Sequence, residues 1–333
     1  MVKIAVVGAS SNLGREILSF LSEGGFESSE IIALEPKSPM GTMVSYGEDD
    51  ELDVLNLDEF DFSKADVSLF ACTLEMAKKY LMKVHRSKTK IVDCSGATDC
   101  ETDVPMIVAG LNDSLLENKQ TNIAAIPNPI VTQLLKPLAK VSEKYGIERI
   151  VLSAYLSASF HSREAMDELF AQTRKIYMNT PFSDNEEIFK KQIAFNVLPQ
   201  VGEFIGEETS TEWQINAEVK KVLGSNVKVH ANLAYVPVFI GAGLFVNVET
   251  SKDVDVNDVR TAIGQTEGVV VFDKPLDGGY VSLSDVQSET DIYVSRLRQD
   301  VSTQNGFSFW CVADNLRASS AKNAYDVMKL MLK

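Results

Sequence analysis

Short apolar runs alternate with amphipathic segments through the first part of the chain. Residues 3–7 form a β-branched run that ends at Gly8, and residues 12–22 carry apolar side chains at helical spacing. The same patterns predict strands at 31–34, 67–71 and 90–93, a helix at 75–85, and solvated connections around short strands in the acidic stretch 48–66. Strands that alternate with helices predict an α/β fold with an open parallel sheet and helices on both faces.

The pattern changes after Ile126-Pro127-Asn128-Pro129. Helices are expected at 130–145, 163–178, 253–267 and 319–332, and strands at 149–159, 227–238 and 243–249. Alternation in the last two strands is typical of an antiparallel sheet with one covered face. The second half therefore predicts a different, α+β type of packing.

Composition and charge exclude several classes of protein. The chain has 333 residues, of which 45% are hydrophobic and 24% charged, and this length predicts two globular domains. Its net charge of −15 disfavours nucleic acid and anionic membranes as partners. The longest apolar runs, about eight residues, are too short to span a membrane. Four cysteines without C-x-x-C spacing favour a reduced cytoplasm over a disulfide scaffold or a metal site.

A glycine turn joins the first strand to the first helix. It reads Gly8-Ala9-Ser10-Ser11-Asn12-Leu13-Gly14. The first glycine permits a tight turn, the last lets the helix pack closely, and free N–H groups at the helix start can face a pyrophosphate. The middle glycine of a G-x-x-G-x-x-G loop is Ser11 here, whose Cβ narrows that approach. The turn predicts descent from a dinucleotide site, and a purely structural turn stays the alternative.

Six blocks of sequence carry a family resemblance along the chain. They are Gly8-Ala9-Ser10 through Gly14, Asp93-Cys94-Ser95-Gly96-Ala97, Ile126-Pro127-Asn128, Ala194-Phe195-Asn196-Val197-Leu198-Pro199, Val236-Pro237-Val238-Phe239-Ile240-Gly241 and Val312-Ala313-Asp314-Asn315-Leu316-Arg317. In this order they resemble the aspartate-semialdehyde dehydrogenase family from end to end.

The resemblance implies both a fold and an activity. It implies a Rossmann-like NADP-binding domain at 1–127, an α+β catalytic-type and dimerisation domain at 128–313, and a C-terminal helix at 314–333 that packs back on the first domain. It also implies a homodimer. The family reaction is the NADP-dependent reductive dephosphorylation of aspartyl phosphate in lysine, threonine and methionine biosynthesis. No metal is expected, because the sequence contains no cluster with metal-ligand spacing.

The family's catalytic residues are missing from the matching positions. Cysteine, glutamine, arginine and histidine are replaced by Pro129, Leu156, Tyr235 and Ala242. A phosphate-binding arginine is replaced by Asp99, and the lysine of an E-x-x-K motif by Gln214. Loss of a positioned acid–base group costs about 10²–10⁴-fold in rate, and loss of the nucleophile removes a covalent pathway. The sequence therefore predicts a catalytically silent homologue, closest in pattern to cysteine-less paralogues of the family.

The resemblance also assigns candidate cofactor residues. They are Gly8, Ser10, Ser11, Asn12, Leu13, Lys37, Ser38 and Asn315. Lys37 and Ser38 follow the second strand, where the family holds the 2′-phosphate of NADP. Asn315 matches a nicotinamide-side asparagine, although Asp314 and Asn315 are equally suited to capping the last helix. Leu74, in contrast, is expected to crowd the nicotinamide ribose. Together these residues leave NADP as a possible cofactor.

Three functions stay open at this point. The favoured one is a silent homologue that acts by binding, including association with an active family member. The second is an active dehydrogenase with relocated groups, for which Cys94 and Cys100 are the plausible thiols. The third is a small-molecule binding or regulatory partner protein. His161, Ser157 and Ser159 are weaker candidates for rebuilt chemistry, because no base or nucleophile stands beside them in the sequence.

Overall fold

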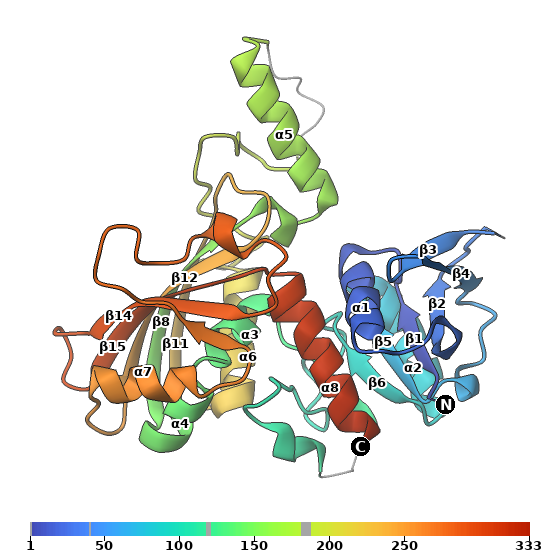
Figure 1. The fold of residues 1–333 in the computed structure, drawn as a ribbon, viewed down its shortest axis with the longest axis horizontal. Helices are drawn as coiled ribbons and strands as arrows, with labels where there is room; N and C mark the ends of the chain where they lie inside the picture. Colours follow the sequence, from blue (N-terminus) through green and yellow to red (C-terminus); the bar gives the residue numbers. More distant parts are fainter. Residues whose placement is uncertain (1, 40, 118–120, 181–187) are drawn as a thin grey trace. The chain divides into compact units, whose positions relative to one another are not determined.

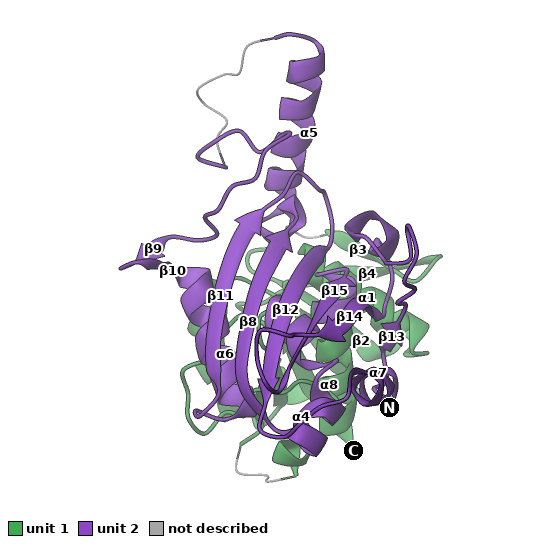
Figure 2. Cartoon of the chain, turned by 90° about the vertical axis from the view of Figure 1, so that its left-hand side faces the viewer, with its two compact units in different colours: residues 1–128, 320–333 green, residues 129–319 purple. Residues whose placement is uncertain are grey.

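The chain folds into two compact units in a computed structural model that describes residues 2–39, 41–117, 121–180 and 188–333 (Figures 1 and 2). Unit 1 comprises Met1–Asn128 and Ser320–Lys333, and unit 2 comprises Pro129–Ser319. Residues 314–319, which the sequence analysis placed with the last helix, group with unit 2.

Unit 1 contains a seven-stranded sheet in the order β3-β4-β2-β1-β5-β6-β7. The strands are β1 Ile4–Val7, β2 Ile31–Glu35, β3 Met43–Tyr46, β4 Asp50–Asn56, β5 Val67–Phe70, β6 Lys90–Asp93 and β7 Ile123–Ala125. All neighbouring pairs are parallel except β3 with β4. This confirms the predicted Rossmann-like sheet. Its antiparallel edge lies in the acidic region, where Leu52 and Val54 alternate inward between exposed acids.

The helices of unit 1 are α1 Asn12–Glu23, α2 Leu74–Arg86 and α8 Lys322–Leu332. Ile17, Leu18 and Leu21 of α1 are buried against the sheet, as their helical spacing predicts. Helix α8 packs beside α1, where the rings of Phe20 and Tyr325 stack with centroids 5.9 Å apart. The end of the chain therefore completes the core of the first unit (Figure 1).

Unit 2 contains a six-stranded sheet in the order β11-β8-β12-β15-β14-β13. The strands are β8 Ile147–Leu156, β11 Lys228–Tyr235, β12 Ala242–Thr250, β13 Val269–Val271, β14 Ile292–Gln299 and β15 Gly306–Ala313, beside the short hairpin β9 Phe204–Ile205 and β10 Glu208–Thr209. The sheet is mixed, since β11 runs parallel to β8 and β13 parallel to β14. The prediction of an antiparallel sheet was wrong for β11, because alternating exposure reports a covered face and not strand direction.

The helices of unit 2 are α3 Pro129–Leu135, α4 Ala139–Tyr145, α5 Arg163–Tyr177, α6 Ser210–Leu223 and α7 Val256–Gly264. In the described part of the chain, single turns lie at Ser28–Glu30, Phe62–Lys64, Asp113–Leu116, Ala158–Phe160, Leu283–Val286 and Arg317–Ala321. The predicted helix at 130–145 is in fact two helices, because Pro137 has no N–H to continue the first. Figure 2 shows α6 behind strands β11 and β8, with no helix across their front face.

Candidate functional site

Three of the four predicted catalytic positions lie in one row of the second sheet. Leu156 ends β8, and its register partners are Tyr235 at the end of β11 and Ala242 at the start of β12. Directly paired residues share a face of the sheet. Leu156 and Ala242 are fully buried, and Tyr235 is 5% exposed. The sheet therefore brings these positions together, but the row carries no amide, guanidinium or imidazole side chain.

The fourth position, Pro129, is the first residue of α3. Ile130 and Val131 follow it, and both are fully buried. One turn later, Gln133 Nε2 donates to the carbonyl oxygen of Ala242 at 2.8 Å, which fastens α3 to the row. Proline suits the first position of a helix, but it has neither a nucleophilic atom nor an N–H.

A chain of buried polar groups lies beside this row. The hydroxyls of Ser157 and Ser159 are 3.0 Å apart, and Ser159 donates to Asn315 Oδ1 at 3.0 Å. The same Oδ1 accepts the backbone N–H of Gly241 at 2.9 Å. In the described part of the chain, neither serine hydroxyl bonds to a histidine or a carboxylate. The two serines therefore lack the adjacent base that a nucleophile needs.

Asp314 and Asn315 have separate structural tasks. Asp314 Oδ1 accepts the N–H groups of Leu316 and Arg317, both at 2.9 Å, so Asp314 caps the turn that leads to α8. Asn315 is 1% exposed and ties the end of β15 to Gly241. Asp314 thus caps the turn Arg317–Ala321 and not α8, which begins without a side-chain cap, and a nicotinamide-side role for Asn315 stays a prediction.

The cysteines differ in environment. Burial raises the pKa of the Cys72 thiol to about 12, and it raises the pKa of Cys94 and of Cys311 well above the ordinary value. Asp93 adds to the shift for Cys72 and Cys94, because a nearby carboxylate disfavours a thiolate. Cys100 is the exposed thiol. Of the two thiols considered for relocated chemistry, Cys94 is therefore held protonated.

A pocket of about 680 Å³ opens next to Tyr235 in unit 2. The rings of His161, Phe189 and Tyr235 form a triangle with centroids 5.1–6.2 Å apart. Burial raises the pKa of the Tyr235 hydroxyl to about 12, and partial burial lowers the pKa of His161, which favours its neutral form. Lys190 and Lys191 line the same pocket. Sequence reasoning missed these two lysines and Phe189, because a loop without periodicity gives no signal of what it faces.

Steric contacts in unit 1 explain both glycines of the turn. Gly8 has a φ of +83°, and a Cβ there would lie 2.3 Å from the carbonyl oxygen of Ala71. A Cβ on Gly14 would lie 2.1 Å from the carbonyl oxygen of Gly8. The close packing of turn, helix and strand therefore requires both glycines whether or not a ligand binds.

The free hydrogen-bond donors of the turn are backbone amides and not the Ser11 side chain. Ser11 Oγ accepts Gly14 N–H at 2.9 Å and donates to Ala71 O at 2.8 Å, so it caps α1 and is not a free donor. In the described part of the chain, the backbone N–H groups of Asn12 and Leu13 have no hydrogen-bond partner. Free amides at a helix start suit a pyrophosphate. The turn thus fits a dinucleotide through these two amides, even with a side chain at the middle position.

The end of β2 contributes an acid that the sequence analysis did not single out. Glu35 Oε1 accepts the backbone N–H of Ser10 at 2.8 Å. Lys37 follows in left-handed conformation, with a φ of +54°. The pKa of Asp58 is lowered mainly by a hydrogen bond from Tyr80, and the charge of Lys37 adds to this shift. The usual signal for such an acid is its place at the end of the second strand, about 20 residues after the glycine turn.

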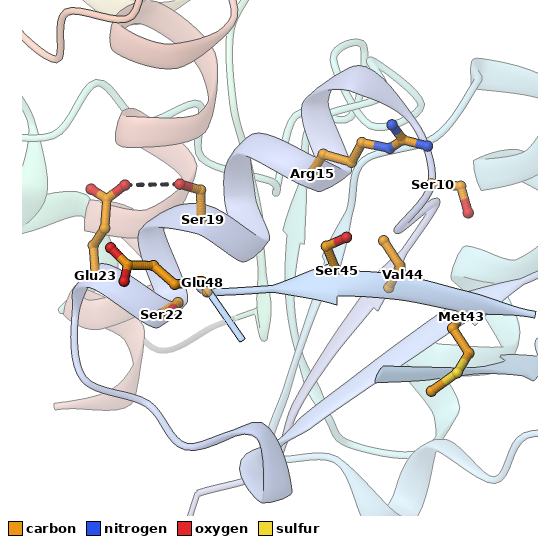
Figure 3. A pocket seen from close by; sticks show the side chains of 10 residues that line it. Ser10, Arg15, Ser19, Ser22, Glu23, Met43, Val44, Ser45 and Glu48 are labelled. Atoms are coloured by element: carbon orange, nitrogen blue, oxygen red, sulfur yellow. Dashed lines mark hydrogen bonds between the residues drawn. The ribbon is translucent and has the colours of Figure 1, made fainter. Parts of the chain in front are cut away.

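A groove of about 670 Å³ runs between α1 and the β3–β4 hairpin (Figure 3). Ser10 and Arg15 lie at one end of it, and Arg15 extends toward Ser10 in this view. Glu23 and Glu48 lie at the other end. The groove therefore holds one cation and two carboxylates.

The described residues form neither a cluster of metal-binding side chains nor a membrane-spanning helix. No group of three or more histidine, cysteine, aspartate or glutamate side chains there is arranged to hold a metal ion. No helix in that part of the chain combines the length and hydrophobicity of a membrane span.

Comparisons with known proteins match both units. Two family models cover the chain: the NAD-binding domain of semialdehyde dehydrogenases matches residues 3–119, and their dimerisation domain matches residues 135–318. The chain is 35% identical over 332 residues to the aspartate-semialdehyde dehydrogenase of Rickettsia bellii, covering 99% of this chain and 97% of that protein. The corresponding protein of Legionella pneumophila is 31% identical over 334 residues, covering 99% and 95%.

Solved structures show the same similarity. The crystal structure of aspartate semialdehyde dehydrogenase II from Vibrio cholerae superposes with a TM-score of 0.92 at 29% identity, covering 99% of this chain and 98% of that chain. The same enzyme in complex with ASA gives a TM-score of 0.93 at 29% identity, over 100% and 98% of the two chains.

The thiol environments predict which cysteine reacts. A thiol with a pKa near 12, such as Cys72, is ionised to about one part in 10⁴ at pH 8, and burial raises the pKa of Cys94 and Cys311 as well, so these three thiols should stay unmodified in the folded protein. We expect a maleimide at pH 8 to label Cys100 alone, as mapped by peptide mass spectrometry, and to label all four cysteines in urea. Rapid labelling of Cys94 in the folded protein would contradict this assignment.

Proposed function

The chain belongs to the aspartate-semialdehyde dehydrogenase family, and from this premise we propose that it binds a nicotinamide dinucleotide but does not run the family reaction. The observation that carries the proposal is the row of Leu156, Tyr235 and Ala242. These residues pair directly, so the three replacements fall at one place in the fold and not at scattered positions. In this respect the chain resembles the cysteine-less paralogues of the family.

The chemistry of the replacements supports the proposal. Pro129 at the start of α3 offers no thiolate, and Ala242 offers no group to transfer a proton. Tyr235 keeps its phenolic proton, because burial raises its pKa to about 12, and it cannot provide the positive charge that holds a carboxylate. Removal of a nucleophile and its base reduces catalysis by about 10⁶-fold in enzymes where this has been measured.

Binding of a dinucleotide is supported separately, by unit 1. The amides of Asn12 and Leu13 at the start of α1 would hold the pyrophosphate. Gly8 and Gly14 keep the turn close to the sheet. A bound nicotinamide dinucleotide would supply hydride transfer, but the residues of unit 2 form no acyl-enzyme to use it. We therefore propose that the bound dinucleotide is a ligand and not a redox partner for aspartyl phosphate.

An assay of the family reaction tests the proposed lack of activity. With aspartate semialdehyde, phosphate and NAD or NADP, we expect nicotinamide reduction at 340 nm to be at least about 10⁴-fold slower than for a family member with the catalytic cysteine. Pro129→Cys alone should stay silent, because Leu156, Tyr235 and Ala242 still lack the glutamine, arginine and histidine functions. A phosphate-dependent rate in the unmodified chain would show that the chemistry has been rebuilt elsewhere.

A homodimer is proposed on the uncovered face of the second sheet. Tyr155, Phe245 and Trp310 cluster there, with the rings of Phe245 and Trp310 4.8 Å apart. Gly243 leaves room for this cluster, because a Cβ at that position would lie 2.1 Å from Trp310 Cη2. Phe245 is 41% exposed, which is typical of a residue that a partner covers. The matching dimerisation-domain family supports this assignment, and the same face is proposed for association with an active family member.

Light scattering tests the dimer. We expect twice the 36.6 kDa chain mass at micromolar concentration, and a shift to the monomer for Phe245→Arg, because a charge would be buried in the interface. Met82→Arg is the matched control, since Met82 is an exposed apolar residue on α2 of unit 1. A monomeric unmodified chain, or dissociation of the control, would contradict the assignment.

A second candidate function rests on the pocket beside Tyr235. Its walls combine the aromatic triangle of His161, Phe189 and Tyr235 with the cationic heads of Lys190 and Lys191. Among the described residues the Tyr235 hydroxyl has no hydrogen-bond partner, so it can donate to a ligand. This chemistry favours a small aromatic carboxylate: the rings pack against its ring and the lysines attract its charge.

Calorimetric titration with 1-naphthoate tests the second candidate. We expect saturable binding that the double variant Lys190→Gln/Lys191→Gln weakens about tenfold, because two attractive charges are lost. Lys220→Gln/Lys221→Gln on α6 is the control of equal charge and should bind normally. Equal binding by both double variants would exclude the proposed role of the pocket lysines.

A further inference from the structure

The carboxylate at the end of β2 is already fixed on the dinucleotide turn. Glu35 is the last residue of β2, and β2 pairs with β1, the strand that leads into Gly8. Its Oε1 accepts the backbone N–H of Ser10 at 2.8 Å. In the described part of the chain, Oε2 has no hydrogen-bond partner. The side chain therefore presents one unused carboxylate oxygen at the turn.

This geometry discriminates between two cofactors. In a Rossmann fold, an acid at this place accepts hydrogen bonds from the hydroxyls of the adenine ribose. NAD(H) has a 2′-hydroxyl there, which donates to a carboxylate, whereas NADP(H) has a phosphate carrying nearly two negative charges. A fixed carboxylate attracts the first and repels the second.

The nearby cations do not reverse this preference. Lys37 lies near another carboxylate, Asp58, whose pKa is lowered mainly by a hydrogen bond from Tyr80 and to a smaller extent by the charge of Lys37. Arg15 is the cation that lines the groove next to Ser10, but the same groove contains Glu23 and Glu48 (Figure 3). Glu23 and Glu48 lie at the far end of that groove, so the carboxylate that the structure fixes at Ser10 is that of Glu35, with Arg15 beside it.

We propose that Glu35 makes this chain a binder of NAD(H) that excludes NADP(H). The inference rests on the proposed function, since it requires that the turn still binds a dinucleotide. It replaces the NADP expectation drawn from the family resemblance. Glu35 acts here as a specificity residue and takes no part in any chemical step.

Fluorescence titration of the full chain with NADH and NADPH tests the proposal. We expect NADH to bind at least tenfold more tightly, since a hydrogen bond to a charged group contributes about 10- to 100-fold to affinity. Glu35→Gln should weaken NADH binding by a similar factor and strengthen NADPH binding, so that the preference disappears. Glu48→Gln is the control: it removes one carboxylate from the same groove but makes no contact with Ser10 and should keep the preference.

Each outcome separates the two proposals. If the unmodified chain binds NADPH more tightly than NADH, the assignment of Glu35 is wrong and the dinucleotide site stands. Loss of that NADPH binding in Arg15→Gln would then identify the arginine as the phosphate ligand. An NADH preference that survives in Glu35→Gln, with an unchanged melting temperature, also overturns the assignment of Glu35. Binding of neither nucleotide overturns the proposed dinucleotide function itself.

Discussion

The pairing of β8 with β11 on one side and β12 on the other is the constraint on which the second unit depends. These contacts are backbone hydrogen bonds, so they hold Leu156, Tyr235 and Ala242 in one row whatever their side chains are. Gln133 donates to the carbonyl oxygen of Ala242, and this contact also depends on the backbone and not on the side chain. A fold held in this way can lose its chemistry without losing its shape, and fold alone does not determine function.

The first unit depends on a steric constraint of the same kind. Gly8 and Gly14 let the turn touch Ala71 and the start of α1 at distances that no Cβ permits. These glycines would persist in a protein that bound nothing, so their presence says little about the ligand. The free amides of Asn12 and Leu13 are likewise present at any helix start, so the acid Glu35 on the Ser10 amide says more about the ligand.

Much of this arrangement could be predicted from sequence, and the failures have physical causes. The strand at β1, the helix α1 and the turn between them follow from local periodicity and from glycine. The row in unit 2 was reached only through a family resemblance, because residues 156, 235 and 242 meet through long-range pairing. The parallel direction of β11 was missed for the same reason. Glu35 was passed over because one acid after a strand resembles any solvated charge until its contact with Ser10 is seen.

The replacements in the row are consistent with one another as well as with lost catalysis. A buried amide, guanidinium or imidazole that has lost its substrate leaves an unpaired polar group, at a cost of about 1–3 kcal/mol each. Leu156 and Ala242 carry no such group, and the ring of Tyr235 packs on Phe189. The polar groups beside the row, Ser159 and Asn315 with the Gly241 amide, satisfy one another by hydrogen bonds. Burial and hydrogen bonding therefore account for the side chains of this region without a substrate, and the proposed role in binding is consistent with that arrangement.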